Sequence, residues 1–427
     1  MNLRVERICG KMSKNDCLAG RKDRKMTERL YYDDSYLWEF DGHVEFIREE
    51  KGNIWVALDR SAFYPTSGGQ PYDTGLIRWE NNSTPVTDVT VDGDGIVWHR
   101  TEHRIPIGTL VHGVIDGFRR TDHMEQHGGE HMLAGAIWEK LGGVTIGLHL
   151  GHEDSSIDVS MPDGRTHLTE NEIQELEKTV NARIRMNAPI RCWFPTEEEL
   201  TVLPLRKKPT VTEHVRIVSM GNFEMVACGG THPDSTGRIG SIKILHAVPS
   251  KGKIRVTFVC GGRAEALFRV YMRSAVKAGN VLSCPPEKIA SSAGELKARL
   301  AEAERKLNRL ETERILEEMA AREEGESLKG ITLSVTVLED GDAKPVAEAV
   351  SRYISRNGRI LLLCVGERLT FACSRDVNAD MNELIRRVAR GGGRTELASG
   401  AGIPQCAEVA RKILMTEGKN RAWRRII

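Results

Sequence analysis

The chain has 427 residues, too many for one domain of ordinary size and enough to bury more than one core. Its 61 Lys and Arg residues almost balance its 60 Asp and Glu residues, so only a local basic patch could support nucleic-acid binding. The nine scattered cysteines exclude a disulfide scaffold and indicate a reducing compartment. No apolar run is long enough to span a bilayer, and no apolar signal core is present, so we expect a cytoplasmic protein.

Residues 1–25 differ in composition from the stretch that follows. They are rich in Lys, Arg and Gly and show no periodicity, whereas the sequence from Met26 looks like an ordinary beginning. We interpret residues 1–25 as a disordered leader or as a start assigned too early.

Short β-prone segments alternate with turn residues between residues 26 and 118. They cover residues 44–47, 54–58, 76–79, 85–91, 96–99 and 109–115. This spacing predicts a small antiparallel barrel or sandwich. Residues 61–75 between them carry Gly68, Gly69 and Gln70. The glycines allow a backbone to approach a ligand closely, and the Gln70 amide can both donate and accept hydrogen bonds. A plain surface turn explains the same spacing.

Two pairs of residues indicate a metal site. A helix predicted over residues 122–141 carries His127 and His131, and the four-residue spacing places both imidazoles on one face. Such a pair alone is more often an ordinary surface or core pair. Cys228 and His232 form a second pair with the same spacing, about a hundred residues downstream. Three imidazoles and one thiolate are a donor set that Zn²⁺ prefers, so the four residues together predict a zinc site.

The remainder of residues 119–280 mixes strands and helices. Predicted strands cover residues 144–150, 156–159, 215–218, 240–245 and 254–259. An amphipathic helix begins at a capping box formed by Thr169 and Glu172. The run of Arg206, Lys207 and Lys208 is a candidate nucleic-acid contact, although such a run is more often a solvated surface.

The pattern changes again in residues 285–327. Apolar residues recur there in steps of four and three among Glu, Lys and Arg, namely Leu296, Leu300, Ala303, Leu307 and Leu310. This predicts a short coiled-coil helix, which either packs in an intramolecular hairpin or self-associates. Residues 328–427 alternate strands and helices in an α/β pattern. We interpret residues 391–394 and 400–402 as glycine-rich turns that can cradle phosphates, although neither has a Walker or dinucleotide spacing.

Four stretches, residues 63–75, 122–131, 228–237 and 391–394, resemble the long form of the AlaX proteins, free-standing relatives of the editing domain of alanyl-tRNA synthetase. The resemblance implies an α+β fold with an N-terminal β-barrel, an α/β zinc-binding editing module, a helical or coiled-coil linker and a C-terminal α/β glycine-rich domain. It implies zinc-dependent hydrolysis of tRNA(Ala) mischarged with serine or glycine. The zinc ligands would be His127, His131, Cys228 and His232. The C-terminal domain would bind tRNA and, with the preceding helix, form a homodimer.

The resemblance also implies roles in the amino-acid pocket, with Gly68, Gly69 and Gln70 as its wall. We expect Gln70 to bond the hydroxyl group of serine, since a site that leaves buried groups unpaired rejects alanine. In this family a threonine or serine usually follows the first histidine, whereas this chain has Gly128. Candidate substitutes for the missing hydroxyl are Thr66, Ser67 and Thr231, of which Thr231 also counts as a candidate catalytic residue.

Two points stay open. Glu125 and Glu130 are candidate general bases, but on an exposed helix they would more often be solvated. The alternatives to editing are a zinc-dependent hydrolase of another ester or amide, and a tRNA-binding protein with a structural zinc.

Overall fold

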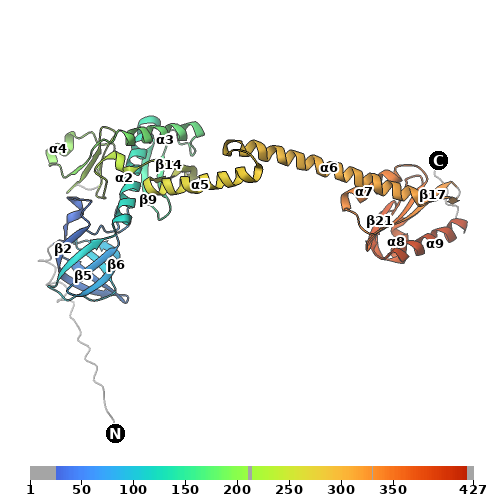
Figure 1. Cartoon of the computed structure of the whole chain (residues 1–427), viewed down its shortest axis with the longest axis horizontal. Coiled ribbons are helices and arrows are strands. Elements are labelled where there is room, and N and C mark those ends of the chain that lie inside the picture. The colour runs from blue at the N-terminus through green and yellow to red at the C-terminus, as the bar shows by residue number, and fades with distance from the viewer. Residues whose placement is uncertain (1–25, 210–213, 329, 421–427) are drawn as a thin grey trace, which may run out of the picture. The chain divides into compact units, whose positions relative to one another are not determined.

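The structure is a computed structural model that describes residues 26–209, 214–328 and 330–420, without the side chains of residues 324–328 and 418–420. The leader predicted for residues 1–25 therefore lies outside the described residues. The chain divides into two compact units, Met1–Ser274 and Ala275–Ile427 (Figure 1). The mixed α+β class is confirmed, while the finer domain boundaries expected from the sequence remain a prediction.

The first unit begins with a closed, six-stranded barrel. Its strands, in barrel order, are β2 (Glu39–Glu50), β3 (Asn53–Leu58), β7 (Val97–Thr101), β6 (Asn82–Val91), β5 (Gly75–Trp79) and β8 (Leu110–Ile115). Every neighbouring pair is antiparallel. Alternate side chains such as Val44, Val56 and Val111 fill the interior. The predicted barrel is confirmed, and the sandwich alternative is wrong. Outside the barrel, β1 (Glu28–Arg29) pairs with β4 (Arg60–Ser61), and η1 (Leu30–Tyr32) lies between them in sequence.

Helix α2 (Gly117–Leu141) follows the last barrel strand and carries the predicted histidine pair. It begins before the predicted residue 122, because the Asp116 side chain caps it by accepting hydrogen bonds from the backbone amides of Phe118 and Arg119. Gly142, with φ of 66°, ends it. A Cβ on Gly129 would lie 2.1 Å from Cys260 Sγ, so glycine at this position lets the helix pack directly against a strand.

Cys260 ends strand β15, which belongs to a four-stranded antiparallel sheet of order β14-β15-β10-β9. This sheet packs against α2 and α3. The elements are β9 (Val144–Leu150), β10 (Ser155–Ser160), α3 (Glu170–Arg185), β14 (Ile242–Ser250) and β15 (Lys253–Cys260). The core between them contains Leu133, Ile157 and Val256. The capping box of Thr169 and Glu172 at the start of α3 is confirmed.

A second, three-stranded antiparallel sheet leads to the Cys228 motif. It consists of β11 (Ile190–Trp193), β12 (Ile217–Met220) and β13 (Glu224–Ala227), with α4 (Glu197–Val202) between the first two strands in sequence and η2 (Thr236–Ile239) after the third. The sequence did not predict β11, and β12 lies two residues later than expected. Because β13 ends at Ala227, the chain leaves the sheet at the first residue of the motif.

Helix α5 (Gly261–Leu282) crosses the division between the units and is followed by η3 (Pro286–Lys288) and the long helix α6 (Ile289–Ala321). The helix predicted within residues 285–327 is confirmed as α6. Its seam residues Leu296, Leu300, Leu307 and Leu310 are each between 54% and 58% exposed, so the seam is not covered within the described chain. No helix among the described residues is both long and apolar enough to cross a membrane.

The second unit contains a six-stranded mixed sheet of order β16-β17-β18-β19-β21-β20. Its elements are β16 (Glu323–Leu328), β17 (Ile331–Leu338), α7 (Ala343–Ile354), β18 (Arg359–Val365), β19 (Arg368–Cys373), α8 (Met381–Val388), β20 (Arg390–Gly393), β21 (Leu397–Ala401) and α9 (Pro404–Asn420). The prediction of glycine-rich turns at residues 391–394 and 400–402 is wrong, because most of these residues form paired strands. A Cβ on Gly391 would lie 2.5 Å from Ser399 O, so glycine permits this close strand pairing.

Candidate metal centre

Two of the predicted ligands, His127 and His131, lie in the middle of α2, where the helix is buried on all sides. Their rings stack with centroids 4.9 Å apart and planes 16° from parallel, as expected for side chains one helical turn apart. Both rings point away from solvent, so one turn of a single helix supplies two imidazoles to the interior of the first unit.

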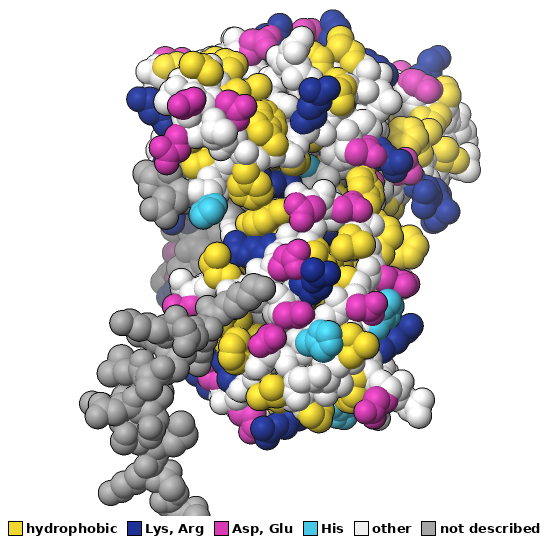
Figure 2. All heavy atoms as spheres, turned by 90° about the vertical axis from the view of Figure 1, so that its left-hand side faces the viewer, with side chains coloured by type: hydrophobic (Ala, Val, Ile, Leu, Met, Phe, Trp, Pro, Cys, Tyr) yellow, Lys and Arg dark blue, Asp and Glu magenta, His cyan; other side chains and the backbone are white. Residues whose placement is uncertain are grey.

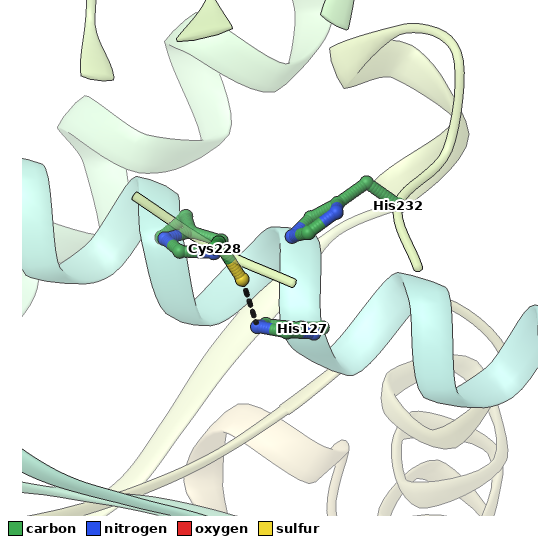
Figure 3. Close-up of side chains that lie close together, drawn as sticks. His127, Cys228 and His232 are labelled. Atoms are coloured by element: carbon green, nitrogen blue, oxygen red, sulfur yellow. Dashed lines mark hydrogen bonds between the residues drawn. The ribbon is translucent and has the colours of Figure 1, made fainter. Parts of the chain in front are cut away.

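The other two, Cys228 and His232, lie in the segment after β13. The His232 ring centroid is 4.5 Å from that of His127 and 5.1 Å from that of His131. The Cys228 Sγ lies 3.4 Å from His127 Nε2, and Figure 3 shows both side chains and His232 converging on one point. One ligand atom from each of the four residues lies within 4.8 Å of the others. The structure therefore brings together all four residues that the sequence predicted as ligands.

The donor set fits a metal ion. Both ring nitrogens of His131 and of His232 are buried without a hydrogen-bond partner among the described residues, although buried polar atoms are almost always paired. Burial lowers the pKa of His127 to about 3 and lowers the pKa of His131 and His232 well below the ordinary value. The three imidazoles therefore stay neutral, which is the form that coordinates a metal. Together with the Cys228 thiol, they can hold a metal ion.

Metal affinity should fall as the pH falls. Burial raises the pKa of the Cys228 thiol to about 12, so the metal-free chain keeps this proton at neutral pH and a metal must displace it. The histidines are already neutral, so one proton is released and the affinity should change roughly tenfold per unit between about pH 6 and 8. Competition with a chromophoric chelator measures this slope. An affinity independent of pH would show that the thiol does not lose a proton on binding.

Gln70 contacts His127 at Nδ1, the ring nitrogen that does not face Cys228. Its Oε1 lies 2.9 Å from His127 Nδ1 and accepts a hydrogen bond from the Thr231 amide at 3.1 Å, and its Nε2 donates to Thr231 Oγ1 at 2.8 Å. When His127 Nδ1–H donates to Gln70, His127 Nε2 is left free to coordinate. Gln70 is fully buried, and the expected bond to a substrate hydroxyl remains a prediction.

The absence of a side chain at Gly230 leaves room for the contact between Gln70 and His127. A Cβ there would lie 2.2 Å from His127 Cε1 and 2.8 Å from Gln70 Oε1, whereas a Cβ on Gly229 would meet only Tyr32 Oη, at 3.5 Å. Gly230→Ala should therefore displace His127 and lower zinc affinity by roughly 10–100-fold, the range seen when the partner of a ligand is lost. Gly229→Ala is the matched control and should bind zinc like the native chain. Equal affinities in a chelator competition would contradict the steric argument.

The interpretation of Glu130 as a solvated carboxylate is wrong. Its side chain is buried, with Oε2 3.4 Å from His131 Nδ1. Burial raises the pKa of Glu130 to about 7, against the opposing charge of nearby Arg206, which itself pairs with Glu224 at 2.8 Å. The carboxylate is buried because the three-stranded sheet packs against α2 through β13, a contact that only the tertiary fold creates. Burial also raises the pKa of Glu125, which accepts a hydrogen bond from the Gly262 amide.

The glycine-rich loop lies beside the cluster. Gly69 has φ of 91°, and a Cβ there would lie 2.7 Å from Leu148 O, so only glycine fits. Ser67 and Gly68 line a cavity of about 570 Å³ that also has Cys228 in its wall. A side chain at position 128 would point toward Ile239 and not toward this cavity, since a Cβ on Gly128 would lie 2.9 Å from Ile239 Cγ1.

Arg216 is a residue of this site that the sequence did not single out. Its Nη1 donates to Cys228 O at 3.2 Å and to Gly230 O at 2.8 Å, so it holds the backbone of the Cys228 motif. A lone arginine inside a β-prone run carries no signal of such a role, because these contacts form only once β12 and β13 pair.

Two family models match the chain. Class II (A) tRNA synthetases match residues 10–119, and the second additional domain of threonyl and alanyl tRNA synthetases matches residues 215–257, which include Cys228 and His232. The fold and the site thus belong to the class of proteins related to alanyl- and threonyl-tRNA synthetases. The alanyl-tRNA editing protein AlaX-L of Pyrococcus horikoshii is 31% identical over 396 residues, covering 88% of this chain and 94% of that protein. The chain belongs to the AlaX-L family, as its motifs predicted.

Longer proteins match as well. The alanine–tRNA ligase of Pyrococcus furiosus is 31% identical over 401 residues, which cover 89% of this chain but only 42% of the ligase. The chain therefore spans less than half the length of this relative. A crystal structure of RecJ from Thermus thermophilus with Mn²⁺ matches 34% of the chain at a TM-score of 0.25 and 17% identity, too weak a likeness for any conclusion.

Proposed function

We propose that this protein acts in the cytoplasm as a zinc-dependent hydrolase that cleaves the ester of tRNA(Ala) mischarged with serine, and also with glycine. The observation that carries the proposal is the convergence of His127, His131, Cys228 and His232 in a chain that matches an alanyl-tRNA editing protein along most of its length. An aminoacyl ester is already activated, so the site has to place the ester and a water molecule and stabilise the developing negative charge.

In this proposal the four ligands hold zinc, which would supply a Lewis acid beside the ester carbonyl. Four protein ligands fill a tetrahedral shell, as in structural sites, so the substrate needs a side from which to approach. Cys228 provides it, since it is half-buried and borders the cavity beside the cluster. The ester would therefore reach the cluster from the Cys228 side.

The residues around the cluster divide the remaining work. Gln70 and Thr231 position His127 through their hydrogen bonds, and the backbone of Gly68 and Gly69 forms the wall of the amino-acid pocket. Because Gln70 Oε1 already accepts two hydrogen bonds, Ser67 is the better-placed partner for the hydroxyl of serine; it is exposed and lines the cavity. Alanine and glycine both lack a hydroxyl for such a partner, so this contact accounts for the preference of serine over alanine and not for the hydrolysis of glycyl esters.

The test is to incubate the purified protein with seryl-, glycyl- and alanyl-tRNA(Ala), before and after zinc removal, and to follow loss of the ester. We expect zinc-dependent loss of the seryl and glycyl esters, with the alanyl ester spared. If metal-replete protein hydrolyses none of the three, the editing function is wrong, and a tRNA-binding protein with a structural zinc takes its place.

We also propose that the chain forms a homodimer through α6, with the C-terminal domain contributing to both dimer and tRNA binding. The exposed seam of α6, which recurs in steps of four and three, is the pattern that a second helix covers. Leu300→Glu and Leu307→Glu should each convert a dimer into a monomer, as measured by light scattering over a range of concentrations. Ala301→Glu is the control on another face of the helix and should leave the dimer intact. A monomeric native chain would contradict the proposal.

A further inference from the structure

A separate cavity lies in the second unit, and none of its lining residues belongs to the metal centre. Its volume of about 320 Å³ is within the range of small-ligand sites, roughly 300–1,000 Å³. One wall is α7, and the floor is the face of the sheet at β19 and β21. The other face of these strands is covered, since Phe371 and Ala398 share a core with α8 and α9. On the side of α7 the sheet stays open at this cavity, where Leu397 is 45% exposed.

Most of the cavity lining is aliphatic. Val346, Val350 and Ile354 recur every four residues, so they form one stripe along α7. Val365 and Leu397 contribute from the strands. No aromatic side chain is among the described residues that line the cavity, so it offers no ring on which a nucleobase could stack. The lining is suited to an aliphatic chain, whose CH₂ groups gain free energy on leaving water.

The polar side chains of the lining lie mainly on one pair of strands. Arg368 and Thr370 are two residues apart on β19, so both side chains are on the same face of the sheet, and Thr370 lies opposite Ser399 of β21. They supply a guanidinium and two hydroxyl groups. None of these three side chains has an ion pair or a hydrogen bond to another described residue. Their donors are therefore free for an acceptor on a ligand.

The unpaired charge of Arg368 is a local feature. The chain as a whole is nearly neutral, and basic and acidic side chains are interspersed over the face seen in Figure 2. The cavity differs, because no Asp, Glu, Lys or His is among the described residues that line it. A carboxylate suits a guanidinium with hydroxyl groups beside it. The ammonium group of a free amino acid would find no carboxylate there.

We propose that this cavity binds a free aliphatic carboxylic acid of medium chain length, with its carboxylate at Arg368 and its chain along the α7 stripe. The stripe from Val346 to Ile354 is about 12 Å long at 1.5 Å per residue, the length of an extended chain of roughly ten carbon atoms. A nucleic acid is a poor fit, because one guanidinium neutralises one charge and no ring offers stacking. The site goes beyond the proposed function and does not depend on it.

The test titrates the zinc-loaded full chain with decanoate, below the concentration at which it forms micelles, and with decanamide, which has the same chain without the charge. The native chain should bind decanoate roughly tenfold more tightly, the effect of one hydrogen bond to a charged group. Arg368→Gln should bind the two molecules equally. Arg356→Gln is the matched control, since it removes an exposed arginine of the same unit outside the lining, and should bind like the native chain.

The aliphatic part of the site has its own readout. From hexanoate through octanoate to decanoate, affinity should rise roughly fourfold for each CH₂ added, because each one leaves water. Ala347→Phe places a ring in the cavity from an exposed position on α7 and should weaken decanoate and decanamide alike, roughly tenfold or more. Ala301→Phe, at an exposed position of α6 outside the lining, is its control and should bind both normally.

Three results would each overturn the proposal: no binding of decanoate at millimolar concentration, equal affinity of the native chain for decanoate and decanamide, or equal affinities of the cavity variants and their controls. An affinity that falls as the protein concentration rises would also overturn it, because a second copy of the chain would then cover the cavity. If decanoate does not bind but Ala347→Phe weakens binding of deacylated tRNA(Ala), the cavity belongs to a nucleic-acid surface and the proposal is wrong.

Discussion

Replacing Cys228 with serine should strip zinc from the purified chain and reduce hydrolysis of seryl-tRNA(Ala) to the rate without enzyme. Cys228 is the one thiol among the four donors, and its Sγ lies 3.4 Å from His127 Nε2. A serine hydroxyl does not ionise near neutral pH and is a harder donor, so the set loses the thiolate that favours zinc. The loss of affinity should exceed the roughly 10–100-fold typical of losing the partner of a ligand.

Cys192→Ser is the matched control for this prediction. Cys192 is also half-buried and lies on β11, but it is not part of the cluster. Metal analysis gives the zinc content of both variants. Cobalt-substituted protein should show thiolate-to-metal absorption that Cys228→Ser loses and Cys192→Ser keeps. If both variants retain zinc equally, Cys228 is not a ligand, and the approach of substrate from its side falls with it.

The metal cluster could be predicted because helix geometry converts spacing in sequence into direction in space. Two histidines four residues apart on a helix must share a face, whatever the helix packs against. Helix geometry does not apply to Cys228 and His232, because their segment is not helical. Their assignment to the metal site depends on a spacing that matches the first pair and on donor atoms that suit zinc. The barrel was predictable for a similar reason, because alternation along short strands separated by turns is a local property.

Contacts that depend on tertiary packing could not be predicted. The resemblance places Gln70 in the pocket wall, but its bond to His127 joins residues 57 positions apart and exists only because the loop docks on α2. Glu130 illustrates the opposite error. Polar residues on a helix usually face water, and the sheet carrying Glu224 buries this one. The prediction of a turn at residues 391–393 is wrong because glycine occurs both in tight turns and in closely paired strands.

A buried ion pair joins the loop that carries Gln70 to the first turn of the helix that carries His127. Asp73 and Arg120 are both fully buried, and Arg120 Nε lies 3.0 Å from each Asp73 carboxylate oxygen. Asp73 Oδ2 also accepts a hydrogen bond from the Tyr64 amide at 2.6 Å. The remaining guanidinium nitrogens donate to Ser35 O and Ala62 O. This network joins the start of α2 to the loop that carries Gln70.

Asp73→Ala should therefore lower the free energy of unfolding by roughly 3–5 kcal/mol, because it leaves the Arg120 guanidinium buried without its counter-charge. At roughly 2–4 °C per kcal/mol, Tm should fall by about 10 °C. The double variant Asp73→Ala/Arg120→Met should lose less than the sum of the two single losses, since it removes both charges. Asp158→Ala, which removes an exposed pair with Arg255, is the control and should change Tm little.

A second readout separates stability from the arrangement of the site. If the ion pair holds the loop against α2, Asp73→Ala should also weaken zinc binding at temperatures where the chain is still folded, since Gln70 then no longer orients His127. The control Asp158→Ala should bind zinc normally. A large fall in Tm with unchanged zinc affinity would show that Gln70 stays in place without the ion pair. An unchanged Tm would show that the chain tolerates a lone buried guanidinium, which the packing around Arg120 argues against.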